Sequence, residues 1–298
     1  MKYDITILTD RRWINPEKPD WYSDQIVNED LVVQKALEKH GLNVTRTNWD
    51  NTNFDWSETR FALFRTVWDY SERWDEFLPW FKRTEKLTQF INPAEQIHWN
   101  LDKHYLQDLA DKGVNIPPTV FLKKGSSQSL IEIFNEAGWS EAVLKPAISA
   151  GGRETYRITK NQTSEFEGSL RELLVTEDMM LQEFQQNVVE KGEVSMMFAG
   201  SKITHSIIKN VKAGDFRVQD DFGGTVKEYL PSDDEINFAQ KVLSSCKNPP
   251  ILGRVDMIWD NQGQLAVGEL EIIEPEMWFR FSPKAALTVA ETIFKEYF

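Results

Sequence analysis

Two short segments near the carboxyl terminus place acidic side chains on what should be neighbouring strands. They are residues 254–258 and residues 268–272, with a turn-forming stretch at 261–263 between them. Because side chains alternate across a strand, Glu269 and Glu271 share one face. Like charges this close repel each other, so burying them together makes sense mainly with cations between them. The two segments therefore predict adjacent strands around a divalent-metal site, whose ligands are Asp256, Glu269 and Glu271.

Two lysines lie in segments that indicate anion binding. Lys145 follows the apolar pair Val143 and Leu144, as in a buried strand, and Lys103 lies in the segment 100–105. Burying a lysine is costly unless an anion compensates it, and a nucleotide phosphate would do so. The alternative for each lysine is an ion pair with an acid of the protein. We interpret both as phosphate ligands.

A glycine pair after Lys145 supports this interpretation. Ser149, Gly151 and Gly152 can form a turn whose backbone amides face a phosphate group. A lone glycine pair is more often only a turn. Its position directly after Lys145 is what favours a role in binding.

The chain divides into three predicted lobes, which together give an α/β fold with α+β lobes. Strand-like and helical segments alternate over residues 1–95, which predicts a parallel sheet. Residues 96–184 mix helices and strands and contain Lys145, which predicts a small α+β lobe. Residues 185–298 include a hairpin signal at 199–201, which predicts an antiparallel sheet.

Polar residues mark the starts of several predicted helices. The four clearest starts are Asp102, Ser129, Ser232 and Ser282. Ser232 is followed three residues later by Glu235, which is a capping-box pattern. Ser282 is followed by a proline, which is favoured at the first position of a helix.

The first lobe is predicted to recognise the substrate. Eight of the eleven tryptophans precede residue 100, and each alone is more often a packing residue than a ligand contact. Arg65, Trp68 and Tyr70 differ because they lie at the end of an apolar strand-like segment. Ligands collect at the carboxyl ends of strands in open α/β sheets. We therefore predict these three residues as substrate contacts.

The composition excludes several partners. The formal net charge is −13 at pH 7, and the basic residues are scattered among acidic ones. Nucleic-acid binding needs a clustered basic face, so no nucleic-acid partner is expected. No window approaches the roughly 20 apolar residues of a membrane span, so no membrane is expected either. A single cysteine, Cys246, excludes an internal disulfide, and the expected location is cytoplasmic.

In their order along the chain, these segments resemble an ATP-grasp enzyme of the glutathione synthetase type, over roughly residues 90–280. The resemblance implies that Lys103 and Lys145 bind ATP, on its triphosphate and adenine side. It places a hinge segment beside the adenine and an acidic residue beside the ribose. The hinge residues would be Gln182, Glu183 and Phe184, and the acidic residue would be Glu193.

The resemblance also implies the catalytic and metal-binding residues. Arg217 matches the arginine that steadies the acyl phosphate, and Lys209 lies on the preceding strand near the same place. Asp256, Glu269 and Glu271 match the magnesium ligands. The third ligand in this family is usually asparagine, so Glu271 makes the site one negative charge richer. Two Mg²⁺ ions are expected, and Mn²⁺ is an alternative.

A closer likeness is to the branch that contains the cyclo-ligase of cycloserine biosynthesis. Three segments carry it, namely 214–219, 254–256 and 269–275. The implied function is an ADP-forming ligase that activates a small-molecule carboxylate as an acyl phosphate and joins it to an amine. Alternatives are ring closure within one substrate, phosphorylation of a hydroxyl or use of a thiol, and a non-catalytic nucleotide-binding scaffold. A homodimer is expected only by analogy.

Overall fold

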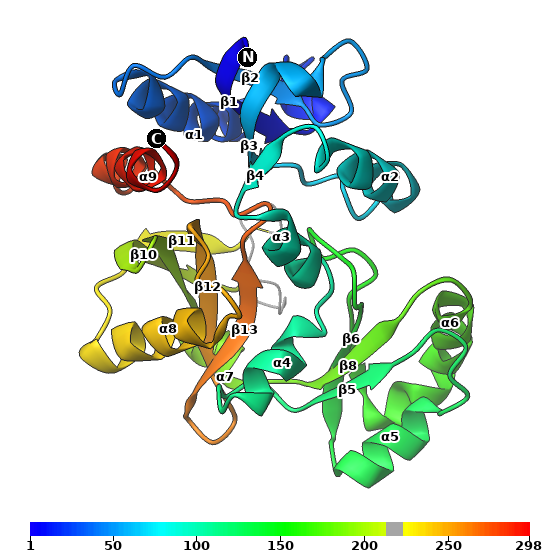
Figure 1. Cartoon of the computed structure of the whole chain (residues 1–298). Helices are drawn as coiled ribbons and strands as arrows, with labels where there is room; N and C mark the ends of the chain where they lie inside the picture. Colours follow the sequence, from blue (N-terminus) through cyan, green and yellow to red (C-terminus); the bar gives the residue numbers. More distant parts are fainter. Residues whose placement is uncertain (213–222) are drawn as a thin grey trace.

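A computed structural model describes residues 1–212 and 223–298 and shows three lobes, each built on its own sheet (Figure 1). Arg217 lies outside the described residues. The predicted α/β fold with α+β lobes is confirmed. The division at residues 1–95, 96–184 and 185–298 stays a prediction.

The first lobe is a four-stranded parallel sheet in the order β2-β1-β3-β4. Its strands are β1 (Tyr3–Thr9), β2 (Val44–Asn48), β3 (Thr59–Thr66) and β4 (Gln89–Ile91). Its helices are α1 (Trp21–Glu38) and α2 (Trp74–Thr84), with short 3-10 turns at Arg11–Trp13 and Trp56–Glu58.

Helix α1 buries charge as well as apolar surface. Its buried face carries Ile26, Val33 and Leu37. Between them, Glu29 and Asp30 are also buried. Two carboxylates on a buried helix face require partners in the folded protein, and these partners lie in β2, β3 and a distant loop.

The second lobe is a four-stranded antiparallel sheet in the order β5-β8-β6-β7, with α5 and α6 packed on it (Figure 1). Its strands are β5 (Thr119–Leu122), β6 (Glu141–Pro146), β7 (Tyr156–Thr159) and β8 (Met179–Glu183). Its helices are α5 (Leu130–Ala137) and α6 (Thr163–Thr176), with a 3-10 turn at Lys160–Gln162. Helices α3 (Ala94–Asn100) and α4 (Tyr105–Asp111) connect β4 to β5, and their buried residues share a core with residues of the first and third lobes.

One of the two helix starts predicted for residues 96–184 is confirmed and the other is wrong. Ser129 caps α5 through a capping box, as predicted. Asp102 does not cap α4 directly, because the helix begins three residues later, at Tyr105. The Asp102 carboxylate instead accepts a hydrogen bond from the backbone N–H of His104 at 3.0 Å, which forms a short turn before the helix.

The third lobe is a five-stranded antiparallel sheet in the order β11-β10-β9-β12-β13. Its strands are β9 (Glu193–Ala199), β10 (Lys202–Asn210), β11 (Thr225–Glu228), β12 (Leu252–Trp259) and β13 (Leu265–Glu271). Its helices are α7 (Asn187–Lys191), α8 (Asp233–Ser245) and α9 (Pro283–Tyr297). The predicted hairpin, the capping box at Ser232 and the helix after Ser282 are all present.

The closing helix joins the end of the chain to its beginning. Helix α9 lies beside α1 (Figure 1), and the two share a buried cluster with β1 and β9. Val33 and Leu37 of α1 meet Val289 and Ile293 of α9 in this cluster. The first and third lobes are therefore packed against each other through a common core. No helix within residues 1–212 or 223–298 is both long and apolar enough to cross a membrane.

Asn92 fastens the first lobe to the third. It lies just after β4 with φ +40°, a backbone conformation that asparagine tolerates better than most residues. Its side-chain amide donates to the carbonyls of Leu252 and Ile272, at 2.8 and 2.9 Å. Its carbonyl oxygen accepts from the N–H groups of Ile251 and Leu252, at 2.7 and 3.2 Å.

We predict that Asn92→Ala lowers the free energy of unfolding by about 2–4 kcal/mol, because four buried hydrogen bonds are lost. Urea denaturation measures this change. Asn92→Gly keeps the backbone conformation accessible and isolates the contribution of the amide. The control is Asn53→Ala, since Asn53 is exposed. An Asn92→Ala protein as stable as the control would contradict this role.

Candidate active site

A cavity of about 560 Å³ brings residues of all three lobes together. Its wall includes Lys145 and Gln182 from the second lobe, Asp256 and Glu269 from the third, and Trp68 from the first. Its volume lies within the usual range for small-molecule sites. The cavity contains most of the residues that the sequence nominated.

The predicted metal ligands form the acidic centre of this cavity. Strands β12 and β13 pair so that Asp256 lies directly opposite Glu269, and Arg254 opposite Glu271. One carboxylate oxygen from each of Asp256, Glu269 and Glu271 lies within 4.8 Å of the other two. The alternation of side chains along two paired strands thus builds the cluster that the sequence predicted.

Arg254 lies within this acidic cluster, and sequence reasoning missed its role. Its Nε donates to both carboxylate oxygens of Asp256, at 2.8 and 3.0 Å. Its Nη2 donates to Asp256 at 2.7 Å and also pairs with Glu271. Side chains two residues apart in a strand lie on the same face, so Arg254 lies beside Asp256 for the same reason that Glu271 lies beside Glu269. This placement could have been predicted from the sequence.

The acids in and beside this cluster differ in their pKa values. Burial alone would raise the pKa of Asp256, but Arg254 and Lys209 lower it to about 2. Burial raises the pKa of Glu271 well above its usual value, because one shared arginine does not offset desolvation and the neighbouring Asp256. Burial likewise raises the pKa of Glu274 to about 7, against the effect of Lys103. Asp256 therefore stays ionised, whereas Glu271 and Glu274 hold protons more readily.

Both predicted phosphate lysines approach the same carboxylate. The Nζ of Lys145 lies 3.4 Å from Oε1 of Glu269, and the Nζ of Lys103 lies 3.7 Å from the same atom. Lys103 also donates to the carbonyl of Ser149 at 2.7 Å. Burial lowers the pKa of Lys145 although Glu269 opposes this shift. The acid that pairs with the lysines is thus itself a predicted metal ligand.

Lys209 forms a second ion pair at the base of the cluster. It lies opposite Glu193 across the β9–β10 hairpin, and its buried Nζ pairs with that carboxylate. The same Nζ is 3.6 Å from Asp256. Both Lys209 and Glu193 line the cavity. The structure therefore places Lys209 beside the metal ligands, and Glu193 in contact with it.

The predicted nucleotide residues line one end of the cavity. Gln182, Glu183 and Phe184 follow one another along and just after β8. Ser149, Gly151 and Gly152 follow β6, and both glycines have positive φ, at +61° and +73°. These φ values favour glycine, so the turn depends on that residue type.

The three predicted substrate contacts separate into two groups. Trp68 and Tyr70 line the cavity, together with Arg12, Trp13 and Tyr22. Arg65 is not among the lining residues. It is 1% exposed and pairs with Glu29 at 3.1 Å, so its guanidinium is buried where the first lobe meets the segment after β13.

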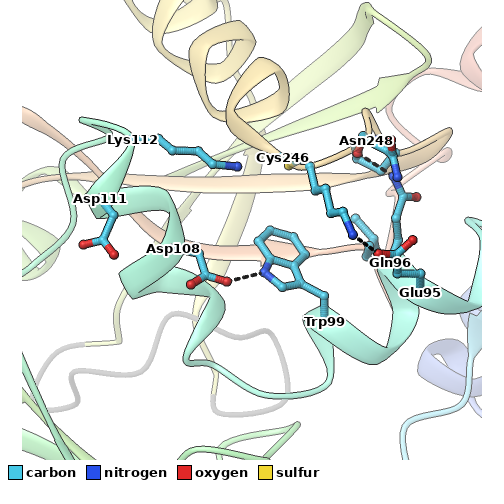
Figure 2. A pocket seen from close by; sticks show the side chains of 11 residues that line it. Glu95, Gln96, Trp99, Asp108, Asp111, Lys112, Cys246 and Asn248 are labelled. Carbon is cyan, nitrogen blue, oxygen red and sulfur yellow. Dashed lines mark hydrogen bonds and ion pairs between the residues drawn. The ribbon is translucent and has the colours of Figure 1, made fainter.

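A second cavity, of about 440 Å³, lies between α3, α4 and the end of α8 (Figure 2). Trp99 forms part of its wall, and the indole N–H of Trp99 donates to Asp108 at 2.7 Å. None of the predicted site residues lines this cavity. The larger cavity is therefore the candidate active site.

Comparison with known families agrees with this geometry. The profile of the prokaryotic glutathione synthetase ATP-grasp domain matches residues 113–263, about half of the chain. The chain belongs to this family. It is an ATP-dependent ligase of the ATP-grasp type. The profile of the D-cycloserine synthetase DcsG N-terminal domain matches residues 5–92, which correspond to the first lobe.

Individual relatives cover nearly the whole ATP-grasp chain. The cycloserine biosynthesis protein DcsG of Streptomyces lavendulae is 27% identical, over 87% of this chain and 90% of the relative. The crystal structure of D-cycloserine synthetase DcsG superposes with a TM-score of 0.85 and 24% identity, and covers 98% of each chain. A D-alanine–D-alanine ligase from Bacillus anthracis complexed with ATP gives a TM-score of 0.69 at 14% identity, and covers 98% of this chain and 96% of the ligase.

We predict that Arg254→Met lowers the free energy of unfolding by about 3–5 kcal/mol in the presence of a chelator, because Asp256 and Glu271 lose their shared cation. Thermal melting measures the loss. Added Mg²⁺ should restore more stability to the variant than it adds to the unmodified protein, since a divalent cation replaces the missing charge. Arg83→Met is the control, because Arg83 is exposed. Equal melting temperatures for the two variants would contradict the role of Arg254.

Proposed function

We propose that this ATP-grasp ligase activates the carboxylate of a small amino-acid-like substrate and joins it to an amine. The substrate carboxylate attacks the γ-phosphorus of ATP, which gives an acyl phosphate and ADP. The amine nitrogen then attacks the acyl carbon, and inorganic phosphate leaves. The observation that carries the proposal is the single cavity, which brings the acid cluster, the lysines and the aromatic end of the first lobe together.

The acid cluster fits a magnesium site. Its three carboxylate oxygens lie close enough to share a cation, and hard oxygen ligands suit Mg²⁺. Asp256, Glu269 and Glu271 would hold the metal, which when bound would offset charge on phosphate oxygens. We expect two ions, and Mn²⁺ is an alternative occupant.

The lysines are placed to exchange partners when nucleotide binds. Lys103 and Lys145 both face Glu269 in the structure, and neither is fully neutralised by that one shared carboxylate. If Glu269 turns to a metal ion, both ammonium groups become available to phosphate oxygens. Their positive charge is then held in place before the reaction, which is the most effective form of electrostatic catalysis.

The remaining nucleotide contacts follow from position in the cavity. We infer that Gln182, Glu183 and Phe184 face the adenine and that Glu193 faces the ribose. The turn that contains Gly151 and Gly152 would cover the phosphates with its backbone amides.

On the reacting side, Lys209 and Arg254 would stabilise charge on the acyl phosphate from within the acid cluster. Arg217 would assist in this role if its segment reaches the cavity.

Ring closure within one substrate is the second candidate function. The match of the first lobe to the DcsG N-terminal domain favours it, because this lobe supplies Trp68 and Tyr70 to the cavity. In this case one molecule supplies both the acid and the amine. The product would have the mass of the substrate minus one water, with one ADP and one phosphate formed per turnover.

Other expectations stay predictions. These are the cytoplasmic location, the homodimer and the choice of metal. The alternative function is a scaffold that binds nucleotide without catalysing a reaction. A measured turnover would exclude it.

We predict that ATP, Mg²⁺ and the correct acid give ADP release that Lys145→Ala lowers by at least about 100-fold, since a positioned cation of this kind contributes about 3 kcal/mol. A coupled assay would survey amino acids, dipeptides and ureido amino acids. Mass spectrometry of the product separates ring closure from joining of two molecules. Lys124→Ala is the control, because Lys124 is exposed in the same lobe. Nucleotide binding without turnover on any acid would favour the scaffold.

We also predict that Mg²⁺ affinity increases with pH. The pKa of Glu271 lies well above its usual value, so at acidic pH this carboxyl holds a proton that metal binding must displace. Affinity should rise by up to about tenfold per pH unit until Glu271 is ionised and then level off. Isothermal titration calorimetry at about pH 5.5, 6.5 and 7.5 measures it. Glu271→Asn should flatten the dependence, and an unchanged slope in that variant would assign the proton elsewhere.

A further inference from the structure

The segment directly after β13 is held by side chains from several elements. We call residues 274–279 the clamped loop. Four consecutive backbone carbonyls of this loop meet a nitrogen donor from outside it. The pairs are Trp68 with Glu274 O at 2.9 Å, Arg65 with Pro275 O at 3.1 Å, Arg254 with Glu276 O at 3.1 Å and His205 with Met277 O at 2.7 Å. The backbone carbonyls of this loop thus have hydrogen-bond partners although the loop is neither helix nor strand.

Glu29 of α1 accepts hydrogen bonds from two backbone N–H groups of the same loop. Its Oε2 accepts from the N–H of Met277 at 2.8 Å, and its Oε1 accepts from the N–H of Phe279 at 2.7 Å. The Arg65 guanidinium donates to the same carboxylate at 3.1 Å. Glu29 is 5% exposed, so these bonds form away from solvent, where their loss is most costly.

The two hydrogen bonds from Glu29 bracket Trp278. This residue has φ +44°, which a bulky side chain rarely adopts and which persists only where the surroundings enforce it. The two oxygens of one carboxylate take the amides on either side and so enforce it. Backbone strain of this kind concentrates at functional sites.

The strained conformation places Trp278 in the active-site cavity. The residue lines the cavity and is 4% exposed. Arg254 lies over its ring at 4.7 Å from the centroid, and Lys209 at 5.5 Å. The buried indole Nε1 has no hydrogen-bond partner among the described residues. An indole nitrogen can only donate, and a buried donor without an acceptor is unfavourable.

We propose that Glu29 is a positioning residue that turns Trp278 into the cavity, where the indole N–H donates a hydrogen bond to an oxygen of the substrate carboxylate. This inference rests on the proposed ligase function and adds a recognition group to it. The acceptor is anionic because Lys209 and Arg254 lie against the same ring and favour negative charge beside it. Arg65, predicted as a direct contact, acts instead through Glu29 and the loop.

Trp278→Phe tests the donor alone, because phenylalanine keeps the aromatic ring and has the same difficulty with positive φ. We expect KM for the acid to rise about tenfold or more, as for loss of a hydrogen bond to a charged group, with the KM for ATP unchanged. Trp21→Phe is the matched control, since Trp21 is 63% exposed. An unchanged KM for the acid would overturn the role of Trp278.

Indole resonances give a readout that does not depend on turnover. The protein has eleven tryptophans, and Trp278→Phe identifies one of their ¹⁵N–¹H indole signals by its loss. With Mg²⁺ and ADP present, acetate is added as a minimal carboxylate, in parallel with the acid found by ADP release. The Trp278 signal should move with either ligand. A signal that moves with neither overturns the assignment, whereas ADP release from ATP by the same protein preparation, measured separately, shows that the ligase function stands.

Glu29→Gln and Glu29→Asp test positioning. Both should shift the Trp278 indole signal before any ligand is added and raise KM for the acid at least fivefold, while nucleotide affinity is kept. Glu29→Asp keeps the charge beside Arg65 and serves if the amide variant does not fold. Glu235→Gln is the control, because Glu235 is equally buried but bonds to Tyr229 and Ser232 and not to the loop or to Arg65. An indole signal that Glu235→Gln moves as much as Glu29→Gln does would overturn the positioning role.

Discussion

The active site depends on the electrostatic balance between carboxylates and cations that are buried together. Asp256, Glu269 and Glu271 would repel one another strongly in a cavity of low polarity. Arg254 is shared by two of them, with Lys209 also near Asp256, and Lys145 with Lys103 compensates the third. A metal ion and a nucleotide bring charges of opposite sign into this balance. The site can therefore bind both ligands together more easily than either alone, which suits an enzyme that uses a metal–nucleotide complex.

Sequence patterns predicted the strands better than the helices. Alternation along residues 254–258 and 268–272 predicted two adjacent strands with their acids on one face, and β12 and β13 pair in this way. The register, which sets Asp256 against Glu269 and shifts directly after Asp256, was not predicted. Helix α6 was not predicted, because its apolar stripe is narrow and only three of its residues are buried. Helix α4 begins later than the capping pattern indicated, because Asp102 bonds locally to His104. Local signals indicate that an element exists, whereas its ends are decided by contacts that the local sequence does not contain.

In the candidate site too, contacts between residues close in the sequence were predictable, and contacts between distant residues were not. The acid cluster was predictable because its three members lie on two strands joined by a short turn. Arg65 was assigned to the ligand because it ends a buried strand, yet its partners are Glu29 and the carbonyl of Pro275, 210 residues away along the chain. No periodicity reveals such a pair. The left-handed conformation of Trp278 was likewise invisible, because it arises from hydrogen bonds to a helix that lies 250 positions earlier.

This long-range clamp joins the first lobe to the acid cluster. Arg254 bonds to the acids of the metal cluster and to the carbonyl of Glu276 in the clamped loop. Arg65 and Glu29 hold the neighbouring residues of the same loop from the first lobe. A change in the first lobe that moves α1 or β3 must therefore move the loop, and through Arg254 it must also alter the acid cluster. We therefore expect that the first lobe cannot be exchanged independently of the acid cluster unless the Glu29–Arg65 pair and its two amide partners are kept.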